Sequence, residues 1–486
     1  MMWIVFLEQF LHNEKEPLLF HTGIFLFLFG AFLIAYSYLF EKPVQRCWLL
    51  IAFGFYFYYK ASGLFLLLLI LTISADYFFA RKIIQDQNPK HKKLWLISGI
   101  LFSLSFLLYF KYKNFFLENF GYVSGQNFKL GQLILPIGIS FYTFQSISFL
   151  VDIYKSKIKL PKYQDYLLYM TFFPHLVAGP IVRAADFLPQ LKKKLVVRKK
   201  DIKEATFLII KGFIKKAIIA DYVAQYSDIV FSDPTSFSAT ESIFAILAYT
   251  LQIFCDFSGY TDMAIGIALL LGYRLCVNFK SPYKSFDITD FWRRWHISLS
   301  SWLRDYIYIP LGGNKKGVQK QYAFLLITML IGGFWHGADW KFIFWGAGHG
   351  LLLVIHKLSL KLIPKEFTKI LWYRIAGWFL TFCLVALLWV PFRAKSLGDT
   401  FILYRNLFDG LDFATVGAIY QTHFWIVILL FFGYFATVMP DSWKEKIYDY
   451  FAKMDYLVLF ALIIILIQVM LQFKSASVQP FIYFQF

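Results

Sequence analysis

The side chain best suited to acid–base chemistry in this sequence is His336, which stands between Trp335 and Gly337 at the junction of two apolar runs. An ionisable group in so apolar a stretch is costly to leave unpaired, which makes it a candidate functional residue. Its imidazole also titrates near neutral pH, as a general base must. The alternative is a structural histidine that is hydrogen-bonded to a neighbouring helix.

Glycines are frequent in the sequence near His336. Six of the chain's 28 glycines fall within the nineteen residues 332–350. This density allows a close approach of two helices or a break in a helix. His349 and His356 lie seven residues apart and share a helix face if that helix is continuous. No HExxH or comparable spacing accompanies them, so we predict no metal site. We interpret His356, beside Lys357, as an ordinary helix-end residue.

A second candidate is the segment FWRRWHISLSSWLRDYIYIPLGG (291–313), which holds three of the chain's eleven arginines: Arg293, Arg294 and Arg304. Arginine suits bidentate recognition of phosphate or carboxylate, whereas lysine supplies only a point charge. The alternative is an interfacial helix that Trp and Arg side chains anchor at the lipid headgroups. His296 and Asp305 argue against this alternative, because an anchor does not need them.

Carboxylates form the third candidate group, with Asp256 and Asp262 inside the apolar run 252–266 and Asp152 at the end of another. Buried carboxylates need partners, and the arginines of 291–313 could supply them. We interpret these residues as ion pairs that hold helices in register. A proton-coupled transporter would also use such residues, so a transport function stays open at this point.

The composition indicates where these residues lie. Of the 486 residues, 59% are hydrophobic, 21% aromatic and 16% charged, and the mean hydropathy is +0.56. A soluble domain carries about a quarter charged residues, so this chain is predicted to span a membrane several times. Four cysteines and no CxxC pair exclude a disulfide scaffold and give no sign of a zinc or redox site.

The net charge of +19 is distributed in a way that favours a membrane over nucleic acid as the partner. Basic residues are concentrated in short loops between apolar runs, as the positive-inside rule and anionic lipid require. These loops are 81–93, 155–162, 192–203 and 315–320. The first ten residues contain no basic region, so we expect no cleaved signal peptide.

Apolar stretches close to the roughly 20 residues that cross a bilayer recur along the whole chain. They are 18–40, 45–59, 62–80, 94–110, 133–153, 205–225, 240–272, 321–336, 341–362, 370–392, 421–439 and 455–473. The run 163–180 is interrupted by Pro174, Gly179 and Pro180, and it is predicted to be re-entrant or interfacial. We therefore predict an all-α polytopic membrane protein with about 11–13 transmembrane or re-entrant helices in a single domain, 1–486.

Six stretches of this sequence together resemble the membrane-bound O-acyltransferase family. They are LPIGISFYTFQSISFLVDIYK (135–155), FFPHLVAGPIVR (172–183), QIFCDFSGYTDMAIGIALLLGY (252–273), FWRRWHISLSSWLRDYIYIPLGGN (291–314), GGFWHGADWKFIFWGAGHG (332–350) and FIYFQF (481–486). The bacterial branch of the family includes alginate and peptidoglycan O-acetylation proteins and the D-alanyl transferase of teichoic acids. The resemblance makes 131–486 the catalytic core, with less specific spans in 1–130. The run IPLGGN is similar to the polysaccharide O-acetylation group.

The resemblance implies a ring of helices around a central funnel in the bacterial cytoplasmic membrane. The family's essential histidine corresponds to His336 and its second histidine to His296. Acetyl-CoA would be the acyl donor, with its phosphates near the arginines of 291–313, and no cofactor would be tightly bound. Trp335 and Asp305 are further candidates for structural or tunnel-lining positions, as are Asp256 and Asp262.

The resemblance also implies partners, namely a polysaccharide acceptor and a separate extracytoplasmic esterase-like (SGNH) acetyltransferase. His336 would remove the proton of a hydroxyl, which then attacks the thioester directly. No Ser or Cys nucleophile motif is present, so we predict no covalent enzyme intermediate. D-alanyl transfer to a teichoic acid-like polymer and transport across the membrane are the two alternatives.

Overall fold

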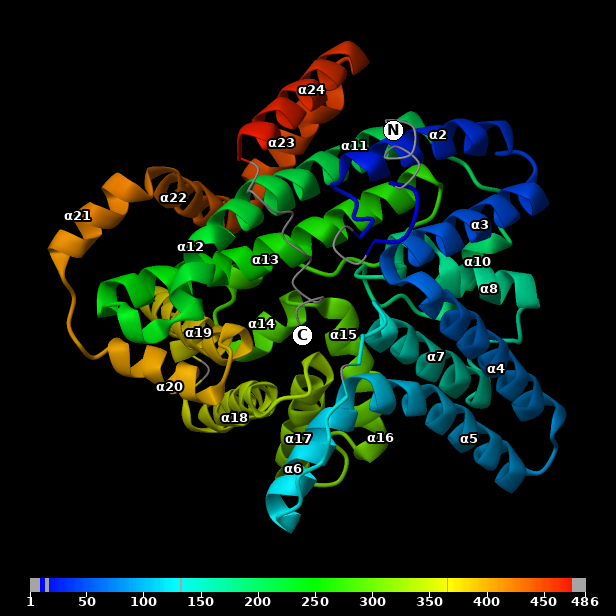
Figure 1. Cartoon of the computed structure of the whole chain (residues 1–486), viewed down its shortest axis with the longest axis horizontal. Coiled ribbons are helices and arrows are strands. Elements are labelled where there is room, and N and C mark those ends of the chain that lie inside the picture. Colours follow the sequence, from blue (N-terminus) through cyan, green and yellow to red (C-terminus); the bar gives the residue numbers. More distant parts are fainter. Residues whose placement is uncertain (1–8, 14–16, 132, 365, 474–486) are drawn as a thin grey trace. The chain divides into compact units, whose positions relative to one another are not determined.

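A computed structural model describes residues 9–13, 17–131, 133–364 and 366–473, and every regular element within them is helical (Figure 1). This confirms the predicted all-α class for the described part of the chain. The terminal FIYFQF stretch lies outside the described residues. The chain divides into two compact units, one of residues 1–205 with 263–276 and one of 206–262 with 277–486. The single domain predicted from the sequence, and the ring that the resemblance implies, stay predictions.

In the first unit, helices α4, α5 and α7 pack against one another, and α3 packs on α8 and α9. Its elements are α2 Gly23–Tyr38, α3 Pro43–Ser62, the 3₁₀ turn η1 Gly63–Phe65, α4 Leu66–Gln85, α5 Pro89–Leu107, the π-helix η2 Leu108–Tyr112, α6 Lys113–Ser124, α7 Ile139–Tyr154, α8 Tyr163–Thr171, α9 Phe173–Leu176 and α10 Ala184–Leu191. Helix α11, Lys199–Phe213, begins in this unit.

The predicted interruption in the run 163–180 is present as two short buried helices, α8 and α9, which are separated at Phe172. Neither is long enough to cross a bilayer alone. Their close approach to α3 depends on Gly54, because a Cβ there would lie 2.0 Å from the carbonyl oxygen of Thr171. The broken backbone is therefore covered by protein, as irregular backbone in a membrane requires.

The second unit contains the candidate residues of 291–350. Its elements are η3 Ile214–Ala220 (π), α12 Asp221–Ser232, η4 Pro234–Ser236 (3₁₀), α13 Ala239–Leu270, whose last turns belong to the first unit, η5 Pro282–Lys284 (3₁₀), α14 Ile288–Arg294, α15 Ile297–Leu303, η6 Arg304–Tyr308 (π), α16 Ile309–Leu311, α17 Val318–His336, α18 Trp340–Leu362, η7 Phe367–Lys369 (3₁₀), α19 Leu371–Arg393, α20 Leu397–Asn406, α21 Phe413–Thr422, α22 Phe424–Val438, α23 Asp441–Lys453 and α24 Tyr456–Phe473.

Glycines bring α17 and α18 together, and the two helices lie side by side in Figure 1. A Cβ on Gly346 would lie 2.4 Å from the carbonyl oxygen of Met329, and one on Gly333 would lie 2.2 Å from that of Phe342. Only glycine permits so close an approach of two backbones. The sequence left open whether these glycines serve close packing or a helix break. The structure shows both, since α17 ends at His336 and α18 begins at Trp340.

Five helical segments of the described chain are long and apolar enough to cross a membrane, or seven if two bent pairs each count as one span. The five are Pro43–Gln85, Pro89–Ser124, Ala239–Leu270, Trp340–Leu362 and Leu371–Arg393. The bent pairs are Phe413–Thr422 with Phe424–Val438, at 99°, and Asp441–Lys453 with Tyr456–Val469, at 115°. Other predicted spans form shorter helices, such as Gly23–Tyr38 and Ile139–Tyr154.

Candidate active site

His336 is the last residue of α17, and its side chain is buried within the second unit. Its ring centroid lies 5.0 Å from that of Trp335, 5.0 Å from Trp345 and 5.1 Å from Phe392. The imidazole is thus enclosed by aromatic rings and does not lie on the outer surface of the unit. Such a low-dielectric setting strengthens the hydrogen bonds that a catalytic imidazole makes.

His296 lies where the Arg-rich segment breaks. Helix α14 ends at Arg294, and α15 begins at Ile297. Between them His296 adopts a left-handed conformation, with φ 41° and ψ 54°, which is uncommon for a residue with a side chain. This break rules out the continuous interfacial helix considered from the sequence. The tryptophans of the segment are also buried in the protein and not available as lipid anchors: Trp292, Trp295 and Trp302.

The two histidines are brought to the same aromatic ring. The ring centroid of Trp335 lies 6.4 Å from that of His296 and 5.0 Å from that of His336. His296 is fully buried, and Phe257 stands edge-on to its ring at 4.6 Å. Residues forty positions apart in the sequence therefore share one buried cluster.

Asn278 determines which nitrogen of His296 carries the proton. The backbone N–H of Ser298 can only donate, and it lies 3.1 Å from the Asn278 Oδ1 atom, which orients the amide. The same oxygen lies 3.1 Å from His296 Nδ1. Because Oδ1 only accepts, Nδ1 must donate to it, and the lone pair of the neutral ring is on Nε2. Burial lowers the pKa of His296 to about 3, so the ring is neutral at physiological pH.

A cationic cavity of about 470 Å³ lies beside this cluster, and Arg293, Arg304 and Lys357 are among its lining residues. No carboxylate of the described residues lines it. Neither Arg293 nor Lys357 forms an ion pair with a carboxylate of the described chain. Arg304 Nε lies 2.7 Å from the Asp305 carboxylate, and most of the Arg304 side chain is exposed. The cavity is thus suited to a ligand with more than one negative charge.

Arg294 is placed differently from the other two arginines. Its Nε lies 2.9 Å from both carboxylate oxygens of Asp290, one turn earlier in α14, and its Nη1 lies 3.4 Å from the carbonyl oxygen of Lys280. Arg294 does not line the cationic cavity. Its role as a donor-binding residue stays a prediction with no geometric support.

Asp256 and Asp262 are paired with lysines, so the prediction that arginines of 291–313 would pair with them was wrong. Lys216 Nζ lies 2.8 Å from Asp256 Oδ1 and 2.8 Å from Asp221 Oδ1. Lys215 and Lys211 lie 2.8 and 3.1 Å from the Asp262 carboxylate. The π-helix η3 and the end of α11 supply all three lysines. The geometry is that of ion pairs between adjacent helices, as the structural interpretation held.

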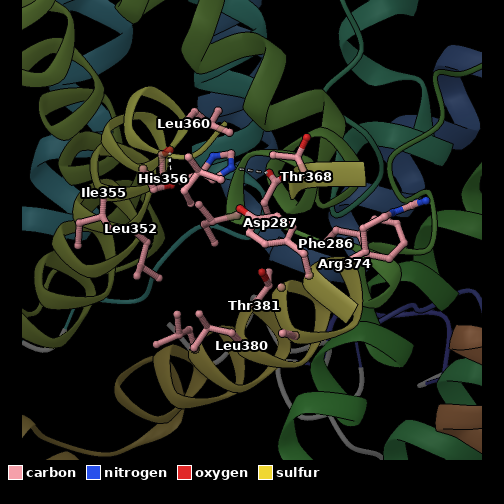
Figure 2. A pocket seen from close by; sticks show the side chains of 17 residues that line it. Phe286, Asp287, Leu352, Ile355, His356, Leu360, Thr368, Arg374, Leu380 and Thr381 are labelled. Carbon is pink, nitrogen blue, oxygen red and sulfur yellow. Dashed lines mark hydrogen bonds and ion pairs between the residues drawn. The ribbon is translucent and has the colours of Figure 1, made fainter. Parts of the chain in front are cut away.

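A second cavity, of about 570 Å³, lies between α18 and α19 and is lined mainly by apolar side chains, such as those of Leu352, Leu380 and Phe286 (Figure 2). His356 lies at its polar end, where Nδ1 is 2.9 Å from Thr289 Oγ1 and Nε2 is 3.8 Å from the Asp287 carboxylate. His356 is thus a partnered residue within α18 and not the helix-end residue that we predicted. Asp287 caps α14, where its Oδ1 accepts from the backbone N–H of Asp290.

Comparison with known proteins identifies the family. Residues 51–392 match the model of MBOAT, the membrane-bound O-acyltransferase family. The chain belongs to this family. It is therefore an acyltransferase that crosses the membrane several times.

Relatives of this acyltransferase include proteins named for O-acetylation. A peptidoglycan O-acetyltransferase of Helicobacter pylori is 40% identical over 80% of each chain. A probable alginate O-acetylase of Pseudomonas putida is 36% identical over 96% of this chain and 100% of its own. The teichoic acid D-alanyltransferase of Streptococcus thermophilus is 28% identical over 53% of this chain and 68% of its own.

Sequence reasoning missed two residues of this site in the acyltransferase, Asn278 and Lys357. Asn278 lies outside every apolar run and carries no motif, so only its buried contact with His296 reveals it. Lys357 was noted only as a neighbour of His356. Its position on α18, one turn beyond Leu353, which also lines the cationic cavity, could have suggested that it shares a face with the site.

Proposed function

We propose that this acyltransferase moves an acetyl group from cytoplasmic acetyl-CoA to an extracytoplasmic acceptor, for O-acetylation of a cell-envelope or exported polysaccharide. The relatives named for peptidoglycan and alginate O-acetylation, at 40% and 36% identity, support this over D-alanyl transfer, for which two relatives are 28% and 30% identical over about half of the chain. The observation that carries the proposal is the convergence of His336 and His296 on the ring of Trp335.

His336 acts as the general base in this proposal. The acyl thioester is already activated, so the enzyme must deprotonate the acceptor hydroxyl and hold it near the carbonyl carbon. A neutral imidazole takes that proton, a contribution of about 10²–10⁴ in rate. The aromatic enclosure of His336 supports this role because it limits the access of water that would hydrolyse the thioester.

His296 assists through Nε2. The hydrogen bond from Nδ1 to Asn278 keeps the lone pair on the other nitrogen. This lone pair accepts a hydrogen bond from a second donor group of the acceptor, beside the hydroxyl that loses its proton to His336, and so orients the acceptor. Because the ring stays neutral, it adds no charge that would oppose protonation of His336 during the reaction.

The cationic cavity binds the phosphates of the donor. Arg293 and Arg304 can each donate two parallel hydrogen bonds to a phosphate, and Lys357 adds a point charge. Among its described lining residues there is no carboxylate that would repel such a ligand. In this assignment the cavity opens to the cytoplasm, where acetyl-CoA is available.

The acetyl group is then passed to a separate extracytoplasmic esterase-like acetyltransferase, which modifies the polysaccharide. In this proposal the chain lies in the cytoplasmic membrane of a bacterium. The chain's own reaction is one acyl transfer from a thioester to a hydroxyl.

Labelled donors test the proposal. Membrane vesicles that contain the chain and expose its cytoplasmic face receive acetyl-CoA labelled in the acetyl group. We expect label in an alkali-labile ester on the lumenal side, and no label in vesicles without the chain. Label that comes only from a D-alanyl carrier thioester would assign the protein to the D-alanyl branch and overturn the acetyl donor.

A further inference from the structure

His349 is a buried titratable residue that the proposed mechanism does not use. It lies on α18 with no solvent-exposed surface, and neither ring nitrogen has a hydrogen-bond partner within the described residues. A neutral imidazole has one N–H group and one lone pair, and leaving either unsatisfied in the interior destabilises the fold. A phenylalanine would fill the same space without that penalty. His349 is therefore better explained by a ligand than by packing.

Two tryptophans beside His349 also have a buried ring nitrogen without a hydrogen-bond partner among the described residues. The ring centroids of Trp345 and Trp292 lie 4.7 and 5.1 Å from that of His349. The indole Nε1 of each is buried and has no acceptor among the described residues. Indole N–H groups only donate, so this cluster offers more donors than acceptors. A ligand with carbonyl oxygens would satisfy it.

The cluster lies between the two parts of the proposed site. Trp292 lines the cationic cavity, and its ring centroid is 5.8 Å from that of Trp345. Trp345 in turn lies 5.0 Å from His336, edge-on to the imidazole. Trp292 and Trp345 thus form a continuous series of ring contacts from the cavity to His336, along which a donor with its phosphates in the cavity could extend its thioester. The arm that joins phosphate to thioester in acetyl-CoA, or in a carrier-bound thioester, carries amide carbonyls.

We propose that Trp292, Trp345 and His349 bind the arm and the carbonyl oxygen of the acyl donor. His349 and Trp292 position the arm, while the indole N–H of Trp345 donates to the thioester oxygen and stabilises the oxyanion that develops there. This inference rests on the proposed function of the site. It extends that function by assigning the residues that bind the donor between its phosphates and its thioester carbonyl carbon.

The reaction balances with the groups named. The hydroxyl proton moves to His336 as the oxygen forms a bond to the carbonyl carbon, which gives an oxyanion held by Trp345. The oxyanion collapses, the carbon–sulfur bond breaks, and the thiolate takes the proton from His336. The products are an ester and a free thiol.

Steady-state kinetics with acetyl-CoA in vesicles that contain the full chain test the proposal. Trp345→Phe keeps the ring and removes the N–H, and we expect kcat to fall by about 10²-fold while KM for acetyl-CoA changes less than about twofold, as expected when a transition-state contact alone is lost. His349→Phe should raise KM about tenfold, and His349→Gln, which keeps a donor and an acceptor, should restore it. Trp378→Phe is the control, because its indole N–H already donates to the carbonyl oxygen of Tyr283 at 2.8 Å.

The outcomes separate this inference from the function on which it rests. Unchanged kcat and KM in Trp345→Phe and His349→Phe, with transfer lost in His336→Ala, would overturn the subsite and leave the function intact. Transfer that persists in His336→Ala would overturn the role of His336 as general base, and no acetyl transfer by the unmodified chain would overturn the function itself. If Trp345→Phe does not accumulate, Trp292→Phe and His349→Phe decide the matter, since loss of thermal stability with unchanged kinetics in both would mark the cluster as structural.

Discussion

The Oδ1 atom of Asn278 accepts hydrogen bonds from His296 Nδ1 at 3.1 Å and from the Ser298 backbone N–H at 3.1 Å and hydroxyl at 2.9 Å. One buried amide oxygen thus sets the tautomer of the second histidine of the site. The relationship links residues eighteen positions apart, on either side of η5 and α14. It supplies the orienting partner that a catalytic imidazole requires.

Substitution Asn278→Asp should change the pH dependence of the reaction. A carboxylate beside Nδ1 stabilises the imidazolium, so the pKa of His296 rises from its low value and the ring gains charge nearer neutrality. We expect kcat/KM of the variant to fall between pH 7 and pH 5, where that of the unmodified protein changes less. Ser298→Ala is the matched control, because the backbone N–H still orients Asn278. Superimposable profiles for Asn278→Asp and the unmodified protein would contradict the tautomer assignment.

Burial of His296 also makes the fold sensitive to acid. Its pKa is about 3 in the folded protein and about 6.5 in the unfolded chain, so the unfolded state binds more protons between these values. Stability is unaffected by this residue above about pH 6.5 and falls as the pH drops below it, by about 2 kcal/mol at pH 5. Thermal midpoints in detergent at pH 7.5 and pH 5 should therefore differ less in His296→Gln than in the unmodified protein. An equal acid shift in both would show that His296 does not carry the effect.

The two adjacent arginines of α14 should behave differently. Arg293 lines the cationic cavity, and Arg293→Gln is expected to raise KM for acetyl-CoA about tenfold at nearly constant kcat, as loss of one phosphate contact does. Arg294→Gln should leave KM unchanged, because Arg294 is engaged by Asp290. Initial rates over a range of donor concentrations measure both. Equal KM effects would refute the assignment of the cavity to the donor phosphates.

The close approach of α17 and α18 predicts a stability effect at Gly346. A Cβ there would lie 2.4 Å from the Met329 carbonyl oxygen, so Gly346→Ala forces the helices apart and should cost about 1–3 kcal/mol or more. Gly417→Ala, which meets nothing within 4 Å, is the control. Thermal unfolding in detergent, followed by the fraction that stays soluble, distinguishes the two. Equal midpoints would mean that the helices do not pack as described.

Local features of this fold were predictable from the sequence, whereas partnerships across the fold were not. The glycines of 332–350 indicated close helix packing, and Pro174 indicated a broken helix. Glycine lacks a Cβ and proline lacks a backbone N–H wherever they stand in a fold, so their effects can be predicted locally. The sequence predicted an arginine of 291–313 as the partner of Asp256, whereas the partner is Lys216. The prediction was wrong because the positions of charged residues in a sequence do not show which basic residue lies near a given carboxylate. Only the packing of η3 against α13 brings Lys216 within 2.8 Å.

The same limit applies to the site. His336 and His296 were identified through family motifs, and the structure places both beside Trp335. Asn278 and Trp345 were not identified, because an asparagine in a loop and a tryptophan in an apolar helix are common. Their significance depends on a single hydrogen bond and on an unsatisfied indole N–H, neither of which a linear sequence displays.

If His336 is the base for acyl transfer, the O-acetyl ester content of the cell envelope depends on this one side chain. Cells that lack the native protein are complemented with the unmodified chain, with His336→Ala or with His91→Ala, a histidine with a largely exposed side chain. We predict that His336→Ala accumulates in the membrane to the normal amount but leaves the ester content at the level of cells without the protein, while His91→Ala restores it. Normal ester content in cells that carry only His336→Ala would contradict the account.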